Sequence, residues 1–307
     1  PRGDPSQPAP PPIKRYAGEF SRWNLEDLPD KWDPEIARLL HEYFELIDRD
    51  KYRGDDVTEI QKIRAQLQKY LASLGPEAIP TLGKILNVEP SYISRRDLLV
   101  AIGNLGPRSE EATWILRDYY FAIREDPSSR SEMGHVIKAM GSLKNENSFE
   151  VLEWLAKNDE HRTYRDKVMT ALSDHPRGAE AVPVFEGGLK DANFHVRNKA
   201  AQALKKVGDT EILDVLMDRF EKERVHWARQ TILGAIGRIG DSDVIPFLEE
   251  QARSAKTDLV RLSAAGAIRR IVQRTGDRYG ARVLKSLARS ETNDTIRVRI
   301  ERWASQL

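Results

Sequence analysis

The chain has 307 residues, of which 40% are hydrophobic and 32% are charged, with no cysteine and a formal net charge of +1. The lack of cysteine excludes disulfides, thiolate metal sites and a cysteine nucleophile within these residues. No stretch approaches the roughly 18 apolar residues that a membrane-spanning helix needs. The charge is uneven, because residues 1–60 carry 9 basic and 14 acidic side chains whereas residues 251–307 carry 13 and 5.

Proline occupies six of the first twelve positions. Such a segment cannot bury a core, so residues 1–20 are predicted to form a disordered, extended tail. Because the sequence begins with Pro1, we expect that residues upstream were removed, either a signal sequence or vector-derived residues. Two locations stay open: a bacterial envelope, where the tail would act as a tether, and the cytoplasm.

Residues 21–60 are predicted to form an N-terminal extension with a capping helix for the repeats that follow. The pair Asp33-Pro34 is typical of a helix start. The apolar side chains behind it fall on one helical side: Ile36, Leu39, Leu40, Tyr43, Phe44 and Ile47. The next polar stretch resembles a calcium-binding EF-hand loop at Asp48, Asp50 and Glu59, but Gly54 stands one position late. A polar loop between helices is the favoured interpretation.

An arginine recurs at intervals of 31 to 36 residues along the rest of the chain. Counted from each arginine, the third, sixth, seventh and tenth residues that follow share one helical face. These positions are hydrophobic in 31 of 32 cases, the exception being His175. The pattern predicts one amphipathic helix per repeat. The recurring arginines are Arg64, Arg95, Arg130, Arg165, Arg197, Arg229, Arg261 and Arg297.

Glycine follows the apolar stripe in five repeats, at Gly75, Gly106, Gly141, Gly208 and Gly240. Because many helices end with a glycine in the left-handed conformation, we expect these glycines to end their helices in this way. The seventh helix is predicted to run one turn longer, to Gly276.

A second amphipathic segment precedes each of the later arginine helices. Three of these segments begin with an apolar residue and a proline, as in Ile79-Pro80, Val182-Pro183 and Ile245-Pro246, which places proline in a first helical turn. A hairpin of two short helices cannot bury both stripes alone, so consecutive units must stack. The predicted fold is an all-α solenoid of about eight helical hairpins across residues 61–307.

Two segments carry a family resemblance: residues 191–208 and 229–248 resemble HEAT repeats of the short bacterial, phycobilisome-lyase-like type. In that family an aspartate before the second helix and an arginine within it form a ladder of pairs between neighbouring repeats. Asp191 with Arg197, and Asp159 with Arg165, match this spacing. Elsewhere the acid is displaced or missing, so the resemblance implies an incomplete ladder in which the recurring arginines are structural.

Catalytic signatures are weak. The HEAT family includes an iron hydroxylase with His-Glu doublets on paired repeats, but only His41-Glu42 occurs here, outside the repeats. The sequence shows no nucleophile elbow and no phosphate-binding glycine loop. We therefore predict no catalytic, metal or cofactor site. Four further histidines are predicted to be loop and surface residues on different faces: His135, His161, His195 and His226.

The eighth and ninth residues after each arginine point away from the apolar stripe and are strongly basic in the later repeats. The predicted interaction surface comprises five residues at these positions and the nearby Arg274: Lys205, Lys206, Arg238, Arg269, Arg270 and Arg274. The leading hypothesis is a noncatalytic scaffold that presents a curved solenoid surface to a protein or peptide. The alternatives are binding of nucleic acid or another polyanion by the basic repeats, and a bilin-lyase-like enzyme or subunit, which only the family resemblance suggests.

Overall fold

The computed structural model describes residues 32–53, 57–89, 91–107, 109–158 and 164–307. These residues form sixteen α-helices and no strand, so the predicted all-α class is confirmed. The chain divides into two compact units, residues 1–176 and 177–307. The predicted tail, Gly54, Asp159 and His161 lie outside the described residues, as do the side chains of Asp48, Asp50 and Glu59.

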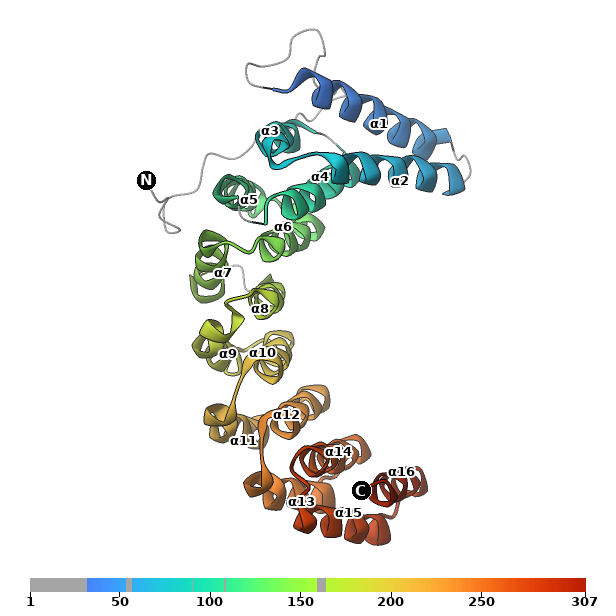
Figure 1. The fold of residues 1–307 in the computed structure, drawn as a ribbon, viewed down its shortest axis with the longest axis vertical. Helices are drawn as coiled ribbons and strands as arrows, with labels where there is room; N and C mark the ends of the chain where they lie inside the picture. The colour runs from blue at the N-terminus through green and yellow to red at the C-terminus, as the bar shows by residue number, and fades with distance from the viewer. Residues whose placement is uncertain (1–31, 54–56, 90, 108, 159–163) are drawn as a thin grey trace. The chain divides into compact units, whose positions relative to one another are not determined.

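The first unit consists of four hairpins stacked in chain order. The second helices of successive hairpins pack on one another, and α3, α5 and α7 form a parallel row (Figure 1). The helices are α1 (Pro34–Arg53), α2 (Val57–Ser73), α3 (Ile79–Val88), α4 (Tyr92–Leu105), α5 (Glu110–Ile123), α6 (Arg130–Ser142), α7 (Glu146–Asn158) and α8 (Arg165–Asp174).

Helix α1 begins at the predicted position. The Asp33 carboxylate accepts hydrogen bonds from the backbone N–H groups of Glu35 and Ile36, at 3.0 and 3.1 Å, as an N-cap residue does. Its apolar side is buried, with Leu40 and Phe44 fully inaccessible. Because α1 packs against α2 and α3, it is the first helix of the first hairpin as well as its cover.

The second unit repeats the arrangement with four more hairpins. Helices α10, α12, α14 and α16 pack in sequence, and each of α9 and α13 has its predicted proline in the first turn after a short 3₁₀ segment. The helices are α9 (Val182–Gly188), α10 (Phe194–Val207), α11 (Leu213–Lys222), α12 (His226–Ile239), α13 (Ile245–Ser254), α14 (Asp258–Thr275), α15 (Arg278–Ser290) and α16 (Asp294–Ser305).

The apolar stripe forms the core of each unit. In α14 all four predicted positions are fully buried, and in α12 only Ile239, the last, is partly accessible. The polar exception, His175, is also buried, with its ring centroid 5.4 Å from that of Phe149. Leu307, at the end of the sequence, is the stripe residue left exposed. Burial of these side chains is the main force that holds successive hairpins together.

The prediction that five glycines end helices in the left-handed conformation is wrong. Gly276 is the only described glycine with positive φ, at 70°, and Gly141 lies inside α6. Gly208 and Gly240 have φ of −78° and −70°. They are needed for space: a Cβ at Gly208 would lie 2.6 Å from the Leu204 carbonyl oxygen and from Ile212, because the next 3₁₀ turn folds back onto the helix end.

Candidate functional site

Two recurring arginines of the first unit join neighbouring hairpins through carboxylates. Arg64 in α2 donates to Asp97 in α4, with Nη2 2.7 Å from Oδ1. Arg95 donates from Nε and Nη2 to both oxygens of Glu132 in α6, at 2.8 and 3.0 Å. Asp97 and Glu132 are buried, and Tyr119 also donates to Glu132. Such two-point contacts compensate buried charges that would otherwise be costly.

The same contact recurs in the second unit with acids from the turn before the next second helix. Arg197 donates to Glu223 at 2.7 and 2.9 Å, and Arg261 donates to Glu291 at 2.9 and 2.8 Å. Each arginine also donates from Nη1 to the carbonyl oxygen six residues before it, on Asp191 and Ala255. Hydrogen bonds with the glutamates raise the pKa of both arginines above the usual value.

The other four recurring arginines lie in different surroundings. Arg130 is exposed, and Arg165 is half-buried at the start of α8. Arg229 lies over the Phe220 ring at 4.1 Å. Arg297 pairs with Asp294 of its own helix at 2.8 Å. Arg130, Arg229 and Arg297 therefore form no ion pair with another hairpin among the described residues, and a structural role for all eight arginines stays a prediction.

The predicted basic surface falls in the second unit but does not form one site. Lys205, Lys206 and Arg238 are exposed on α10 and α12. Arg274 instead reaches back to the end of α12, where Nη1 donates to the Arg238 carbonyl at 2.9 Å and Nη2 donates to that of Gly240. The Arg269 guanidinium lies 5.4 Å from the Trp303 ring centroid. Arg274 and Arg269 are therefore engaged with the protein itself.

Two of the predicted residues, Lys205 and Arg270, line a common groove of about 530 Å³. Helices α10, α12, α14 and α16 contribute to it, and we call it the cationic groove. Among the described residues that line it, three are basic and none is acidic. They are Gln202, Lys205, Gln230, Thr231, Gly234, Leu262, Ser263, Gly266, Arg270, Arg299 and Trp303.

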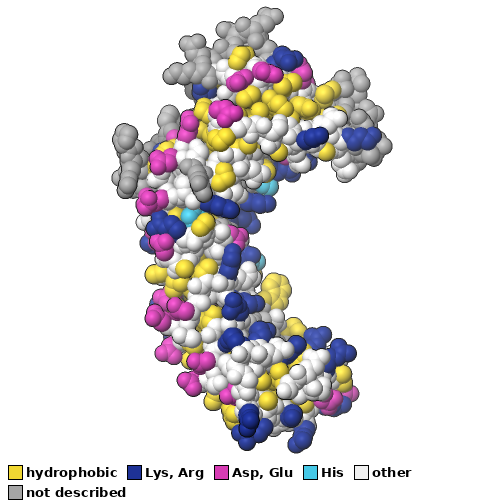
Figure 2. Space-filling view, in the orientation of Figure 1, with side chains coloured by type: hydrophobic (Ala, Val, Ile, Leu, Met, Phe, Trp, Pro, Cys, Tyr) yellow, Lys and Arg dark blue, Asp and Glu magenta, His cyan; other side chains and the backbone are white. Residues whose placement is uncertain are grey.

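Figure 2 shows the charge separation around this region within the second unit. Lysine and arginine gather over the second helices α10 and α12, whereas aspartate and glutamate gather over the first helices α9 and α11. The predicted interaction surface left out Arg299 and the two glutamines, because it was drawn mainly from the eighth and ninth residues after each arginine. The second and fifth residues, such as Ser263 and Gln202, share the exposed face of the same helices.

The cationic groove contains donors without a protein partner. The Nε atom of Arg270 and the Nε2 atom of Gln230 are buried and form no hydrogen bond in the described structure. Burial lowers the pKa of Arg270 below its usual value, and the neighbouring Arg269 charge lowers it further. This environment is the opposite of that of Arg197, because no carboxylate compensates the Arg270 charge.

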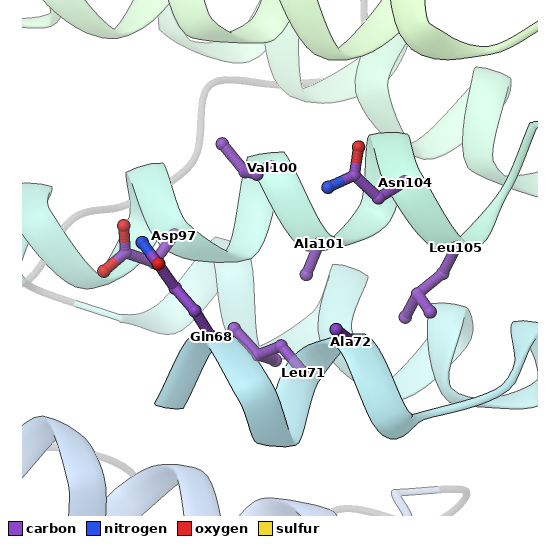
Figure 3. Close-up of a pocket in the computed structure, with 8 residues that line it drawn as sticks. All are labelled: Gln68, Leu71, Ala72, Asp97, Val100, Ala101, Asn104 and Leu105. Atoms are coloured by element: carbon purple, nitrogen blue, oxygen red, sulfur yellow. The ribbon is translucent and has the colours of Figure 1, made fainter. Parts of the chain in front are cut away.

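A smaller cleft of about 250 Å³ lies between α2 and α4 in the first unit (Figure 3). Leu71 and Ala72 of α2 face Ala101 and Leu105 of α4, while Val100 and Asn104 project on the other side of α4. Asp97 at one end is held by Arg64. The cleft is therefore mainly apolar, and its charged group is already neutralised.

The described histidines do not converge. His195 and His226 are exposed, but the prediction of a loop or surface position is wrong for His135, which lies half-buried inside α6 near the Tyr92 ring. Burial lowers the pKa of His135, and Lys138 lowers it further. In the described part of the chain, no three His, Asp or Glu side chains are grouped as a metal site requires, and no helix has the length and apolarity to cross a membrane.

Comparison with known proteins agrees with the architecture. A family model described as HEAT repeats matches residues 150–234 and 188–269. None of the curated proteins compared matches the sequence. The structure of human deoxyhypusine hydroxylase in complex with glycerol aligns over 86% of this chain and 96% of that chain, with 16% identity and a TM-score of 0.35, too low to carry an argument. The narrower phycobilisome-lyase-like subtype is not confirmed. The stacked helical hairpins and the family-model match identify residues 150–269 of this chain as HEAT repeats.

Proposed function

We propose that this protein is a noncatalytic interaction scaffold that binds a protein or peptide partner through the second-helix face of its second unit. The observation that carries this proposal is the cationic groove, where Lys205, Arg270 and Arg299 line one cavity without an acidic side chain. Stacked helical repeats offer such surfaces over several neighbouring helices, so that one partner contacts more than one repeat.

Exposed apolar side chains near the groove favour a protein partner. Trp227, Leu259 and Val298 are 66%, 58% and 59% exposed on α12, α14 and α16. Large exposed apolar groups beside charged ones are typical of protein interfaces. Nucleic-acid backbones are bound chiefly by cations along a track, which gives the aliphatic Leu259 and Val298 no role, although bases could stack on Trp227.

The chemistry of the groove supports a noncatalytic role. Ser263 lines it, but no His, Asp or Glu stands among the described lining residues to act as its base, and a serine nucleophile needs such an activating group. The other hydroxyl, of Thr231, is held by Asn198 at 2.6 Å. The groove is thus equipped to hold an anion and lacks the paired groups of acid–base catalysis.

Affinity capture from a nuclease-treated lysate of the native source tests this function. The bait would be the wild-type chain, the groove variant Lys205→Gln/Arg299→Gln, or the control variant Arg282→Gln/Arg289→Gln. The control changes two exposed arginines of α15 outside the groove. We expect a protein that wild type and control retain and the groove variant loses. Equal recovery on all three baits would overturn the proposal.

Binding of nucleic acid or another polyanion is the second candidate, favoured by the excess of basic side chains in residues 251–307. The salt dependence of binding distinguishes the two candidate functions. Polyanion binding falls steeply as salt rises, because it releases condensed counterions, whereas a protein interface with buried apolar groups weakens less. Capture of nucleic acid alone from an untreated lysate would support this second candidate.

A further inference from the structure

Two glycines leave unoccupied space at the base of the cationic groove. A Cβ at Gly234 in α12 would meet only the Lys205 Nζ atom, at 3.8 Å. A Cβ at Gly266 in α14 would lie 3.5 Å from the Trp303 ring and 3.8 Å from Arg270 Nη1. Two of the cations and the indole therefore converge above helix surfaces that carry no side chain at these points. The groove leaves room for a foreign side chain.

The groove also lacks the carboxylate that this chain supplies to three other buried or partly buried arginines. Arg95, Arg197 and Arg261 each meet a glutamate through two hydrogen bonds. Arg270 is half-buried beside Arg269, and its Nε donor is unmatched in the described structure. A buried donor without an acceptor is costly. A carboxylate entering the groove would supply the missing acceptor.

The groove also contains uncharged polar side chains that can form hydrogen bonds with a ligand. Gln230 presents a buried Nε2 donor without a partner among the described residues, and Gln202 and Ser263 line the same space. Amide and hydroxyl groups both donate and accept hydrogen bonds, so they suit a peptide backbone, which carries both functions. Phosphate oxygens only accept hydrogen bonds. A phosphate would therefore pair with the donor groups and leave the acceptor groups without a partner.

Apolar and acidic groups border the groove on its own helices. Trp227 precedes Thr231 by one helical turn and Leu259 precedes Ser263 by one turn, so each side chain shares a helix side with a groove residue. Exposed carboxylates stand at the starts of α14 and α16, at Asp258 and Asp294, with side chains 51% and 81% exposed. These acids pair with Arg261 and Arg297 of their own helices, at 2.7 and 2.8 Å. Apolar side chains of a peptide can contact Trp227 and Leu259.

From these contacts we propose that the cationic groove binds an acidic segment of a partner protein, with a glutamate or aspartate carboxylate held by Lys205, Arg270 and Arg299 and with apolar neighbours on Trp227 and Leu259. The inference rests on the proposed function and specifies its partner class. It assigns Arg299 and Trp303, from the last helix, to the same site as Lys205 from α10.

Fluorescence anisotropy tests the site with a labelled peptide of repeated Gly-Glu-Leu-Glu units. Its two comparison probes are the same peptide with glutamine in place of glutamate, and an oligodeoxythymidine of equal negative charge. The proteins are wild type, the groove variant Lys205→Gln/Arg299→Gln and the control variant Arg282→Gln/Arg289→Gln. Both changes remove two positive charges from exposed positions, so general electrostatic attraction falls equally. Thermal melting establishes that both variants are folded.

We expect the acidic peptide to bind wild type and control alike and to bind the groove variant at least about 10-fold more weakly, equivalent to about 1.4 kcal/mol. The glutamine peptide should bind none of them measurably. Equal weakening by the two variants would overturn the site. Tighter, groove-dependent binding of the oligonucleotide would overturn the choice of ligand in favour of a polyanion.

Failure of this inference is distinguishable from failure of the proposed function. If a native protein is still captured through the groove but the acidic peptide does not bind, the partner class is wrong and the scaffold function stands. If the acidic peptide binds through the groove but no native protein depends on it, the scaffold function is overturned and the anion site stands.

Discussion

Arg197 in α10 and Glu223 in the turn after α11 meet through two hydrogen bonds, with Nε 2.7 Å from Oε2 and Nη2 2.9 Å from Oε1. Arg219 donates to the same carboxylate at 2.9 Å, and the backbone N–H groups of Arg224 and Val225 donate to it as well. Glu223 therefore joins two consecutive hairpins and anchors the turn between α11 and α12.

Replacing Glu223 by glutamine should change the stability of the protein and its pH dependence. Burial alone raises the pKa of Glu223, but the hydrogen bonds from Arg197, Val225 and Arg219 outweigh burial and lower it to about 2 from 4.5. A lowered folded-state pKa means that the stabilisation is present above pH 4.5 and is lost as the pH falls toward 2. Glu223→Gln should lower the free energy of unfolding at neutral pH by about 3 kcal/mol.

Urea unfolding at a series of pH values measures this effect. Between about pH 5 and pH 3 the variant should lose less stability than wild type, because it lacks this titrating carboxylate. Glu301→Gln, at an exposed carboxylate 4.0 Å from Arg297, serves as the control and should follow wild type. Identical pH dependence for Glu223→Gln and wild type would contradict the assignment.

An aspartate at position 235 should unfold the second unit or lower its melting temperature strongly. Ala235 is fully buried in α12, on the stripe that packs between hairpins, and a carboxylate there has no partner to offset its desolvation. Arg238→Asp, at an exposed position of the same helix, is the matched control and should melt close to wild type. Circular dichroism measures both, and an unchanged melting temperature for Ala235→Asp would refute the assigned register.

Alanine should have opposite effects at two glycines of α12. A Cβ at Gly237 would lie 2.6 Å from the Ala267 Cα, where α12 and α14 pack backbone to backbone, whereas a Cβ at Gly234 meets only the flexible Lys205 tip at 3.8 Å. Gly237→Ala should therefore destabilise by about 1–3 kcal/mol. Gly234→Ala should stabilise by about 0.5–1 kcal/mol, because glycine is a poor helix former. The denaturant midpoint of each variant shows whether its stability rises or falls. Equal shifts of the midpoint for the two variants would show that close packing at position 237 does not determine the effect.

Arg274 should contribute to stability and not to peptide binding. Its guanidinium satisfies carbonyl groups at the end of α12, on Arg238 and Gly240. Arg274→Gln should cost about 1 kcal/mol in unfolding free energy and leave the anisotropy of the bound acidic peptide unchanged. A loss of peptide affinity equal to that of the groove variant would place Arg274 in the recognition surface after all.

Local patterns in the sequence were sufficient for the helices and their order. The apolar stripe and pairs such as Ile245-Pro246 report on contacts within one helix or one turn, and such short-range features are legible without coordinates. They correctly predicted the hairpins, the long α14 and the burial of positions such as Ala264.

Contacts between hairpins were decided only by tertiary structure. The family resemblance implied a pair between Asp191 and Arg197. In the structure, Arg197 donates to the backbone carbonyl of Asp191 and pairs with the carboxylate of Glu223 from the next hairpin. Likewise, Arg299 lies 94 residues after Lys205 in the sequence but lines the same groove. Periodicity determines which side of a helix a residue occupies, whereas the distance and rotation between packed helices determine which side chains meet across repeats.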